Sequence, residues 1–126
     1  MKLLIDTHIY LWALGAPDKL SSSIRDALET PTNTVYVSSI IVAEIMIKAS
    51  IGKLRVDFDP VAMAEETGFE LLDFTANDAS LLKDMPFHHR DPFDRMLVAQ
   101  CISNALYIVT EDDKFKWYDC RRFGAP

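Results

Sequence analysis

Short runs of apolar residues recur along the chain, and longer segments with helical spacing lie between them. In the first run, Leu3, Leu4 and Ile5 follow one another with no polar residue between them. A strand of this kind is buried on both faces, as in a parallel sheet that is covered by helices on either side. We expect strands at residues 3–5, 35–37, 69–74 and 106–110, and an edge strand at 118–123.

Capping residues mark the segments between these strands as helices. Asp59 and Asp91 are each followed by a proline, which places a favoured N-cap before a favoured first helical residue. Gly52 and Gly68 can each end a helix. We expect helices at residues 8–14, 21–29, 40–51, 60–67, 76–83 and 93–103, and a short one that ends near residue 117.

Strands that alternate with helices predict βαβ units and a parallel sheet with helices on both faces. The length of 126 residues suits one domain with one packed core. Apolar residues make up 49% of the chain and charged residues 25%, as in an ordinary globular protein. We therefore expect residues 1–126 to form a single α/β domain with a four- to five-stranded parallel sheet.

The net charge of −6 is not that of a general polyanion-binding protein, which carries a basic surface. Acidic residues gathered in one cleft would also give a negative net charge, and bound cations would offset their charges locally. Cys101 and Cys120 form neither a metal-binding spacing nor a disulfide framework, which favours a reducing, cytoplasmic location. No segment has the length of a membrane span, and the N-terminal residues do not form a signal peptide.

Six candidate acids follow apolar strands or lie at the start or in the first two turns of predicted helices: Asp6, Glu44, Asp91, Asp94, Asp112 and Asp113. Asp6 and Asp112 come just after predicted strands. Glu44 lies in the second turn of one predicted helix and Asp94 in the first turn of another. In an open parallel sheet, the regions just beyond the carboxyl ends of the strands border one crevice where the strand order reverses. The predicted fold therefore permits these carboxylates to meet, although it does not require it.

Each acid also has a purely structural interpretation. Asp91 is expected to be an N-cap, and Asp94 can complement the helix dipole. Glu44 can pair with Lys48 one turn later on a solvent-exposed face. The acids that follow strands can cap the next helices. The structural interpretation is preferred for each residue alone, so a shared site depends on the acids being considered together.

If these carboxylates meet, their mutual repulsion raises their pKa values unless a cation lies among them. Oxygen ligands suit Mg²⁺ or Mn²⁺ rather than zinc, and no histidine or cysteine pattern typical of a zinc site lies near them. A Mg²⁺ ion held by carboxylates can activate a water molecule and bind a phosphate oxygen. The acids thus indicate metal-assisted hydrolysis of a phosphate ester or phosphodiester.

Four segments carry a recognisable pattern when they are taken in order. They are Leu-Ile-Asp-Thr-His at residues 4–8, the stretch 38–54, Asp-Pro-Phe-Asp-Arg at 91–95, and Val-Thr-Glu-Asp at 109–112. Together they resemble a PIN domain, in particular the VapC-type ribonuclease toxins of bacterial type II toxin–antitoxin pairs. The resemblance implies a three-layer α/β/α sandwich and a Mg²⁺-dependent endoribonuclease. It also implies an RNA substrate, a cognate antitoxin as partner, and a homodimer.

The resemblance also suggests roles for individual residues. By position, the family's acidic quartet, which is catalytic and binds the metal ion, corresponds to Asp6, Glu44, Asp94 and Asp112. Thr110 corresponds to a Thr or Ser that supports the quartet, and Asp91 to an accessory position found in part of the family. Asp113 is an additional acid without a counterpart.

Within the quartet, the hypothesis assigns Asp6 and Asp94 as the main ligands of Mg²⁺ (or Mn²⁺). Glu44 would orient or deprotonate the attacking water, and Asp112 would bind the ion directly or through water. The basic residues nearest to the acidic motifs are expected to belong mostly to the solvated surface, with contact to the RNA backbone as their alternative role. Lys48 and Arg95 are the residues selected for RNA contact from the set Lys48, Lys53, His88, His89, Arg90 and Arg95.

Three other functions are compatible with an α/β domain of this length. A two-component receiver domain requires an acidic pair after the first strand, and only Asp6 is present there. A phosphatase of the haloacid-dehalogenase type requires Asp-x-Asp, and His8 occupies the second position. A catalytically silent PIN scaffold that binds RNA or protein is the third alternative, and the complete acidic quartet argues against it.

Overall fold

The sheet is built entirely from parallel strands, and the first strand lies at its centre. The computed structural model describes residues 1–124. Within them the strands are β1 (Lys2–Ile5), β2 (Thr34–Ser38), β3 (Glu70–Leu72), β4 (Tyr107–Val109) and β5 (Arg121–Arg122). Their order in the sheet is β3-β2-β1-β4-β5. The register pairs Leu4 of β1 with Tyr36 on one side and with Ile108 on the other.

Helices connect each strand to the next. In residues 1–124 the α-helices are α1 (Thr7–Gly15), α2 (Ser22–Glu29), α3 (Ser39–Ser50), α4 (Pro60–Thr67), α5 (Ala76–Ala79) and α6 (Pro92–Ser103). Short 3₁₀ turns cover Pro17–Lys19, Leu82–Asp84 and Asp113–Trp117. The predicted N-caps are confirmed for α4 and α6, since the side chains of Asp59 and Asp91 accept backbone N–H groups there.

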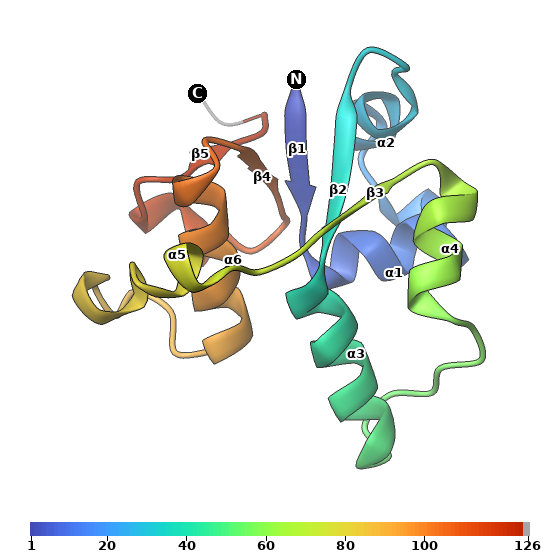
Figure 1. The fold of residues 1–126 in the computed structure, drawn as a ribbon. Helices are drawn as coiled ribbons and strands as arrows, with labels where there is room; N and C mark the ends of the chain where they lie inside the picture. The colour runs from blue at the N-terminus through green and yellow to red at the C-terminus, as the bar shows by residue number, and fades with distance from the viewer. Residues whose placement is uncertain (125–126) are drawn as a thin grey trace.

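The connections place helices on both faces of the sheet. The helices α1 to α4 lead the chain from β1 through β2 to β3, and α5 and α6 then return it to β4 on the other side of β1. Because parallel crossovers are right-handed, this reversal puts α5 and α6 on the face opposite to α1–α4. In Figure 1, α1, α2 and α4 lie beside β2, whereas α5 and α6 lie beside β4. The predicted α/β/α sandwich is confirmed.

The predicted elements differ from the observed ones mainly at their ends. The strands expected at 69–74 and 118–123 are limited to β3 and β5, which lie at the two edges of the sheet and have one neighbour each. The helix expected at 76–83 is wrong in its length, because α5 ends at Ala79 and a 3₁₀ turn follows. Ser80 and Leu81 form a turn between the two, and Met85, which precedes Pro86, is extended, as is usual for a residue before proline.

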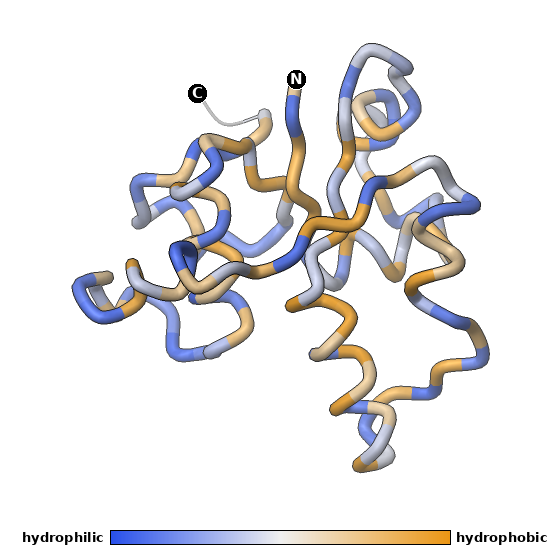
Figure 2. Tube along the Cα trace, viewed as in Figure 1, coloured by the Kyte–Doolittle hydropathy of each residue, from blue (hydrophilic) through white to orange (hydrophobic). Residues whose placement is uncertain are grey.

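The hydrophobic core follows the central strands. Leu3, Leu4 and Ile5 are fully buried, as expected for a strand covered on both faces. Figure 2 shows apolar residues along the middle of the sheet and hydrophilic residues in many of the connecting loops. Cys101 and Cys120 are free and buried. None of the helices in residues 1–124 combines the length and the apolar character that crossing a membrane requires.

Candidate metal and catalytic site

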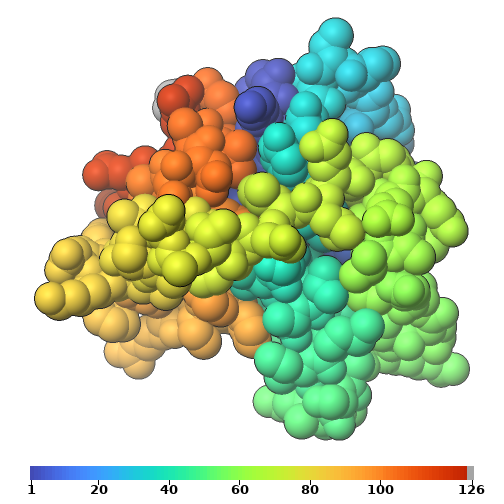
Figure 3. Space-filling view, in the orientation of Figure 1, coloured from blue at the N-terminus to red at the C-terminus, as the bar shows by residue number. Residues whose placement is uncertain are grey.

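The four acids of the predicted quartet, called here the acidic cluster, surround the point where the strand order reverses. Asp6 directly follows β1, and Asp112 lies just beyond β4. Glu44 comes from α3, and Asp94 from the first turn of α6. In the space-filling view, α3 and the segment that leads into α6 stand on either side of an indentation at the lower edge of the molecule (Figure 3). This is where open parallel sheets bind ligands.

Asp6 serves both the fold and the acidic cluster. Its Oδ1 accepts a hydrogen bond from the N–H of Ile9 (2.9 Å), which caps α1, and its Oδ2 accepts one from Thr110 Oγ1 (2.5 Å). Burial raises the pKa of the Asp6 carboxyl, although the hydrogen bonds from Thr110 and Ile9 oppose the rise. Thr110 Oγ1 in turn accepts the N–H of Asp112 (3.0 Å). Thr110 therefore connects Asp6 with the turn that carries Asp112.

Glu44 does not lie on the solvent-exposed face that its spacing to Lys48 suggests. The residue is only 4% exposed. Its Oε1 accepts a hydrogen bond from Thr7 Oγ1 (2.8 Å), and its Oε2 pairs with Lys48 Nζ (2.6 Å). This hydrogen bond raises the pKa of Lys48, and the charges of Asp91 and Asp94 add to the rise. The predicted ion pair exists, but it points into the cleft.

The first turn of α6 contributes two carboxylates of different function. Asp91 is the N-cap, and its Oδ1 accepts the N–H groups of Phe93 (2.8 Å) and Asp94 (3.4 Å). Burial and then the charge of Asp91 raise the pKa of Asp94 to about 7. Glu44 and Asp6 act in the same direction. Acids from three segments of the chain, which carry Asp6, Glu44 and the start of α6, are thus close enough to repel one another.

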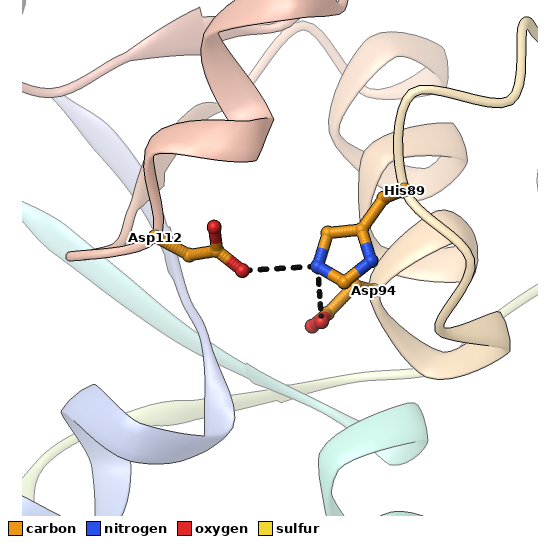
Figure 4. Close-up of side chains that lie close together, drawn as sticks. All are labelled: His89, Asp94 and Asp112. Carbon is orange, nitrogen blue, oxygen red and sulfur yellow. Dashed lines mark hydrogen bonds and ion pairs between the residues drawn. The ribbon is translucent and has the colours of Figure 1, made fainter.

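A histidine that was expected at the solvated surface lies between two of these acids. His89 is 8% exposed. Its Nε2 is 2.9 Å from Asp112 Oδ2 and 3.0 Å from Asp94 Oδ2 (Figure 4). His89 therefore lies in the cleft with the carboxylates, and the expectation that it belongs to the solvated surface is wrong. His89 comes from the loop at residues 85–90, whose sequence has no periodicity, and its position shortly before the Asp-Pro-Phe-Asp motif is the signal that could have found it.

Asp112 and its neighbour Asp113 have separate roles. Asp112 Oδ1 accepts the N–H of Lys114 (2.9 Å), so it caps the 3₁₀ turn while its Oδ2 faces His89. Burial raises the pKa of Asp112, but hydrogen bonds from Lys114 and His89 lower it overall. Asp113 is exposed and pairs with Arg122 at 3.4 Å. A surface pair of this kind contributes little to stability, and Asp113 does not belong to the acidic cluster.

Arg95 holds the loop that carries His89. Its Nη1 donates to the carbonyl oxygen of Pro86 (2.8 Å), and its guanidinium lies over the ring of Phe87 at 4.0 Å. The residue is only 7% exposed, which removes it from the surface that an RNA backbone could reach. We therefore assign Arg95 to anchoring this loop, whereas Lys48 remains the predicted contact for RNA.

The acidic cluster fits a hard divalent cation. Carboxylate oxygens are the ligands that Mg²⁺ and Mn²⁺ prefer. The raised pKa values of Asp6 and Asp94 reflect buried negative charge that the surrounding protein donors compensate incompletely. A cation would remove this repulsion. Among residues 1–124, the possible ligand atoms that all lie within 4.8 Å of one another belong to Asp94, Asp112 and His89. Asp6 and Glu44 are the further carboxylates of the acidic cluster that would help to hold the ion.

Known proteins resemble this chain in sequence pattern and in fold. Residues 3–119 match the model of the PIN domain family. The structure of VapBC2 from Rickettsia felis, bound to a DNA fragment from the promoter, has a TM-score of 0.72 and 20% identity, with 97% of this chain and 96% of that chain covered. A DNA-bound VapBC from Salmonella typhimurium has a TM-score of 0.66 and 21% identity, with the same coverage of 97% and 96%.

A third structure is VapBC-5 from Mycobacterium tuberculosis, a member of the VapBC family of toxin–antitoxin systems. Its TM-score is 0.57 at 19% identity, with 94% of this chain and 90% of that chain covered. A comparison with curated protein sequences gives no match. The family model covers most of the sequence, and the similar structures share its fold over nearly the whole length. The chain belongs to the PIN domain family.

Proposed function

We propose that this protein is a Mg²⁺-dependent endoribonuclease and the toxin of a type II toxin–antitoxin pair. Membership of the PIN domain family supports nuclease activity, and the similarity to VapBC complexes supports the toxin–antitoxin context. The observation that carries the proposal is the acidic cluster, in which burial and neighbouring carboxylates raise the pKa of Asp94 to about 7. Such a cluster is stable at neutral pH when it shares a cation.

The metal ion would be held mainly by Asp6 and Asp94, with Asp112 binding it directly or through water. When bound, Mg²⁺ would polarise a water molecule and a phosphate oxygen and would offset the charge of the carboxylates. Thr110 holds Asp6 in one orientation through its hydroxyl. Hydrogen bonds of this kind orient metal ligands.

Glu44 would act on the attacking water, and Lys48 would contact the RNA substrate. The Glu44 carboxylate is held in one orientation by Thr7 and Lys48, and it would orient or deprotonate the water that attacks the phosphodiester. General-base catalysis requires a positioned group of this kind. The Lys48 side chain is 38% exposed, so its ammonium can contact an RNA phosphate from the mouth of the cleft.

An antitoxin and a second copy of the chain are the protein partners of this proposal. Exposed apolar side chains near the end of α3 offer surface for such contacts, since grouped apolar side chains on a surface mark interaction sites. They are Met46, Ile47 and Ile51. Light scattering of the isolated protein tests the homodimer, and co-purification with the product of an adjacent small gene tests the antitoxin.

The direct test is cleavage of single-stranded RNA by the purified protein with Mg²⁺, with EDTA, and with the Asp94→Asn variant. The proposal predicts internal cleavage that requires Mg²⁺ and that the variant loses. Cleavage that persists in EDTA, or that the variant retains, would contradict the metal-dependent site. Binding of Mn²⁺ without cleavage of any RNA would favour the catalytically silent PIN scaffold.

A further inference from the structure

His89 occupies a central position in the cleft, and the acidic chemistry proposed above assigns it no role. Its Nε2 is 2.9 Å from Asp112 Oδ2 and 3.0 Å from Asp94 Oδ2. Figure 4 shows one nitrogen of the imidazole facing both carboxylates, with Asp94 beside the ring and Asp112 across from it. A nitrogen in this position can be a metal ligand or a hydrogen-bond donor, and the two roles require different states of the ring.

The other ring nitrogen decides between these roles. The N–H of Asp91 donates a hydrogen bond to His89 Nδ1 (3.1 Å), so Nδ1 presents a lone pair. In a neutral imidazole one nitrogen is an acceptor and the other carries the hydrogen. The hydrogen is therefore on Nε2, where it points at the carboxylates of Asp94 and Asp112. In this tautomer Nε2 has no lone pair to offer a metal ion.

The ring has little freedom to adopt another arrangement. The backbone N–H of His89 donates to Tyr118 Oη (2.9 Å), and the imidazole meets the ring of Phe115 edge-on at 5.9 Å. Arg95 donates to the same Tyr118 hydroxyl (3.4 Å) and to the carbonyl oxygen of Pro86 (2.8 Å). A change of tautomer would also leave the N–H of Asp91 facing another N–H. The surroundings thus hold Nε2–H toward the acids.

We propose that His89 is a positioning residue that donates its Nε2–H to Asp94 and Asp112 and so sets the distance between two carboxylates that face the metal ion. The inference rests on the proposed metal-dependent function and adds to it a residue outside the acidic quartet. Groups that hold metal ligands by hydrogen bonds commonly change metal affinity by about 10–100-fold when they are removed. His89 would act in this way without binding the ion itself.

Substitutions at His89 separate a donor from a ligand. Glutamine can place an amide N–H close to the position of Nε2, whereas phenylalanine fills the same space without a donor. We expect His89→Phe to weaken Mn²⁺ binding, measured by titration calorimetry, by about 10–100-fold, and His89→Gln to restore most of it. His88→Phe is the matched control, because the neighbouring His88 is exposed and its ring contacts Tyr118 rather than an acid. It should bind Mn²⁺ as the wild type does.

Each calorimetric outcome has a defined consequence. Equal weakening in the Gln and Phe variants would show that His89 is a ligand, and unchanged affinity in the Phe variant would show that it has no role in binding. Either result would overturn the inference while leaving the proposed function intact. If the wild-type protein bound no Mn²⁺ at all, the proposed function would fail together with the inference.

NMR of the imidazole nitrogens of wild-type protein supplies a readout that does not depend on folding of a variant. We expect the His89 signals to show hydrogen on Nε2 and none on Nδ1 in the metal-free protein, and no change of tautomer when Mg²⁺ is added. Hydrogen on Nδ1 in the metal-free protein, or its appearance there on addition of Mg²⁺, would overturn the proposal. This result is independent of whether the protein cleaves RNA.

Discussion

The two sides of the cleft hold their acids in different ways. On the side of β1, both oxygens of Asp6 accept hydrogen bonds, from the N–H of Ile9 and from the hydroxyl of Thr110. These donors belong to α1 and to the end of β4, which are fixed by the core. On the side of α6, Asp94 has acidic neighbours, and its Oδ2 faces His89 from a loop at 3.0 Å. Donors from α1 and from the end of β4 thus offset part of the charge of Asp6, whereas a histidine from a loop offsets part of the charge of Asp94.

This difference assigns two tasks to one site. Asp6 is held in place before any ion arrives, as a ligand on a rigid element should be. Asp94 lies among other carboxylates, Asp91, Glu44 and Asp6, whose charges raise its pKa, so a cation bound beside it would relieve this repulsion. Substitutions on the two sides should therefore differ in the property that they change.

The largest effect is expected from Asp94→Asn. The amide keeps the size of the side chain but removes its charge, so Mn²⁺ affinity falls and Mg²⁺-dependent RNA cleavage drops by about 10²–10³-fold, as is typical for removing one group that stabilises charge. Cleavage assays and titration calorimetry measure both. Asp113→Asn removes the same charge from an exposed pair outside the cleft and should act like the wild type. Equal losses in the two variants would mean that total charge, and not the acidic cluster, controls binding.

Thr110→Val tests the side of β1. The substitution keeps the shape but removes the hydroxyl that donates to Asp6 and accepts from the N–H of Asp112. We expect metal affinity to fall by about 10–100-fold, with Thr110→Ser close to the wild type because it keeps the hydroxyl. Full affinity in the Val variant would show that Asp6 does not need this support.

Arg95→Met tests the loop on the side of α6. The variant loses charge-assisted hydrogen bonds to loop carbonyl groups, and we expect the free energy of unfolding in urea to fall by about 1.5–3 kcal/mol. Arg90→Met, at an exposed position of the same loop, is the control and should be nearly neutral. Hydrogen exchange should increase in residues 85–90 and stay unchanged in β1. An equal increase in β1 would mean that Arg95 supports the whole core instead of this loop.

A further effect concerns pH in the absence of metal. The pKa of Asp94 is about 7 in the folded protein and about 3.9 in an unfolded chain. Between these values the folded state retains a proton that the unfolded state has lost, so stability falls as pH rises through this range. In EDTA, the melting temperature of Asp94→Asn should exceed that of the wild type by more at about pH 8 than at about pH 4. A difference that does not change with pH would contradict the raised pKa.

The side of β1 could be predicted from the sequence because its geometry follows from local rules. An uninterrupted apolar strand that ends in an acid predicts where Asp6 lies, and the same rule places Asp112. The caps of α4 and α6 follow from Asp-Pro pairs in the same way. In each case, a few neighbouring residues determine the backbone, and the parallel sheet then brings the strand ends together.

The parts of the site that come from α3 and from the loop before α6 could not be predicted in full because tertiary contacts decide them. Glu44 has a lysine one turn later, a spacing that is typical of exposed helices, yet Thr7 from another element holds it in the cleft. His89 belongs to a loop whose course is fixed by Arg95 and Tyr118. The position of His89 shortly before the Asp-Pro-Phe-Asp motif is a sequence signal, but the contacts that hold it and Glu44 in the cleft have none.

Anomalous diffraction from a crystal soaked in Mn²⁺ tests most directly whether the acidic cluster shares one cation. The expected result is an ion peak within bonding distance of oxygens of Asp6 and Asp94, with His89 Nε2 still hydrogen-bonded to a carboxylate and outside the coordination sphere. A map with no peak between these carboxylates, under conditions in which Mn²⁺ saturates the protein in solution, would contradict the account.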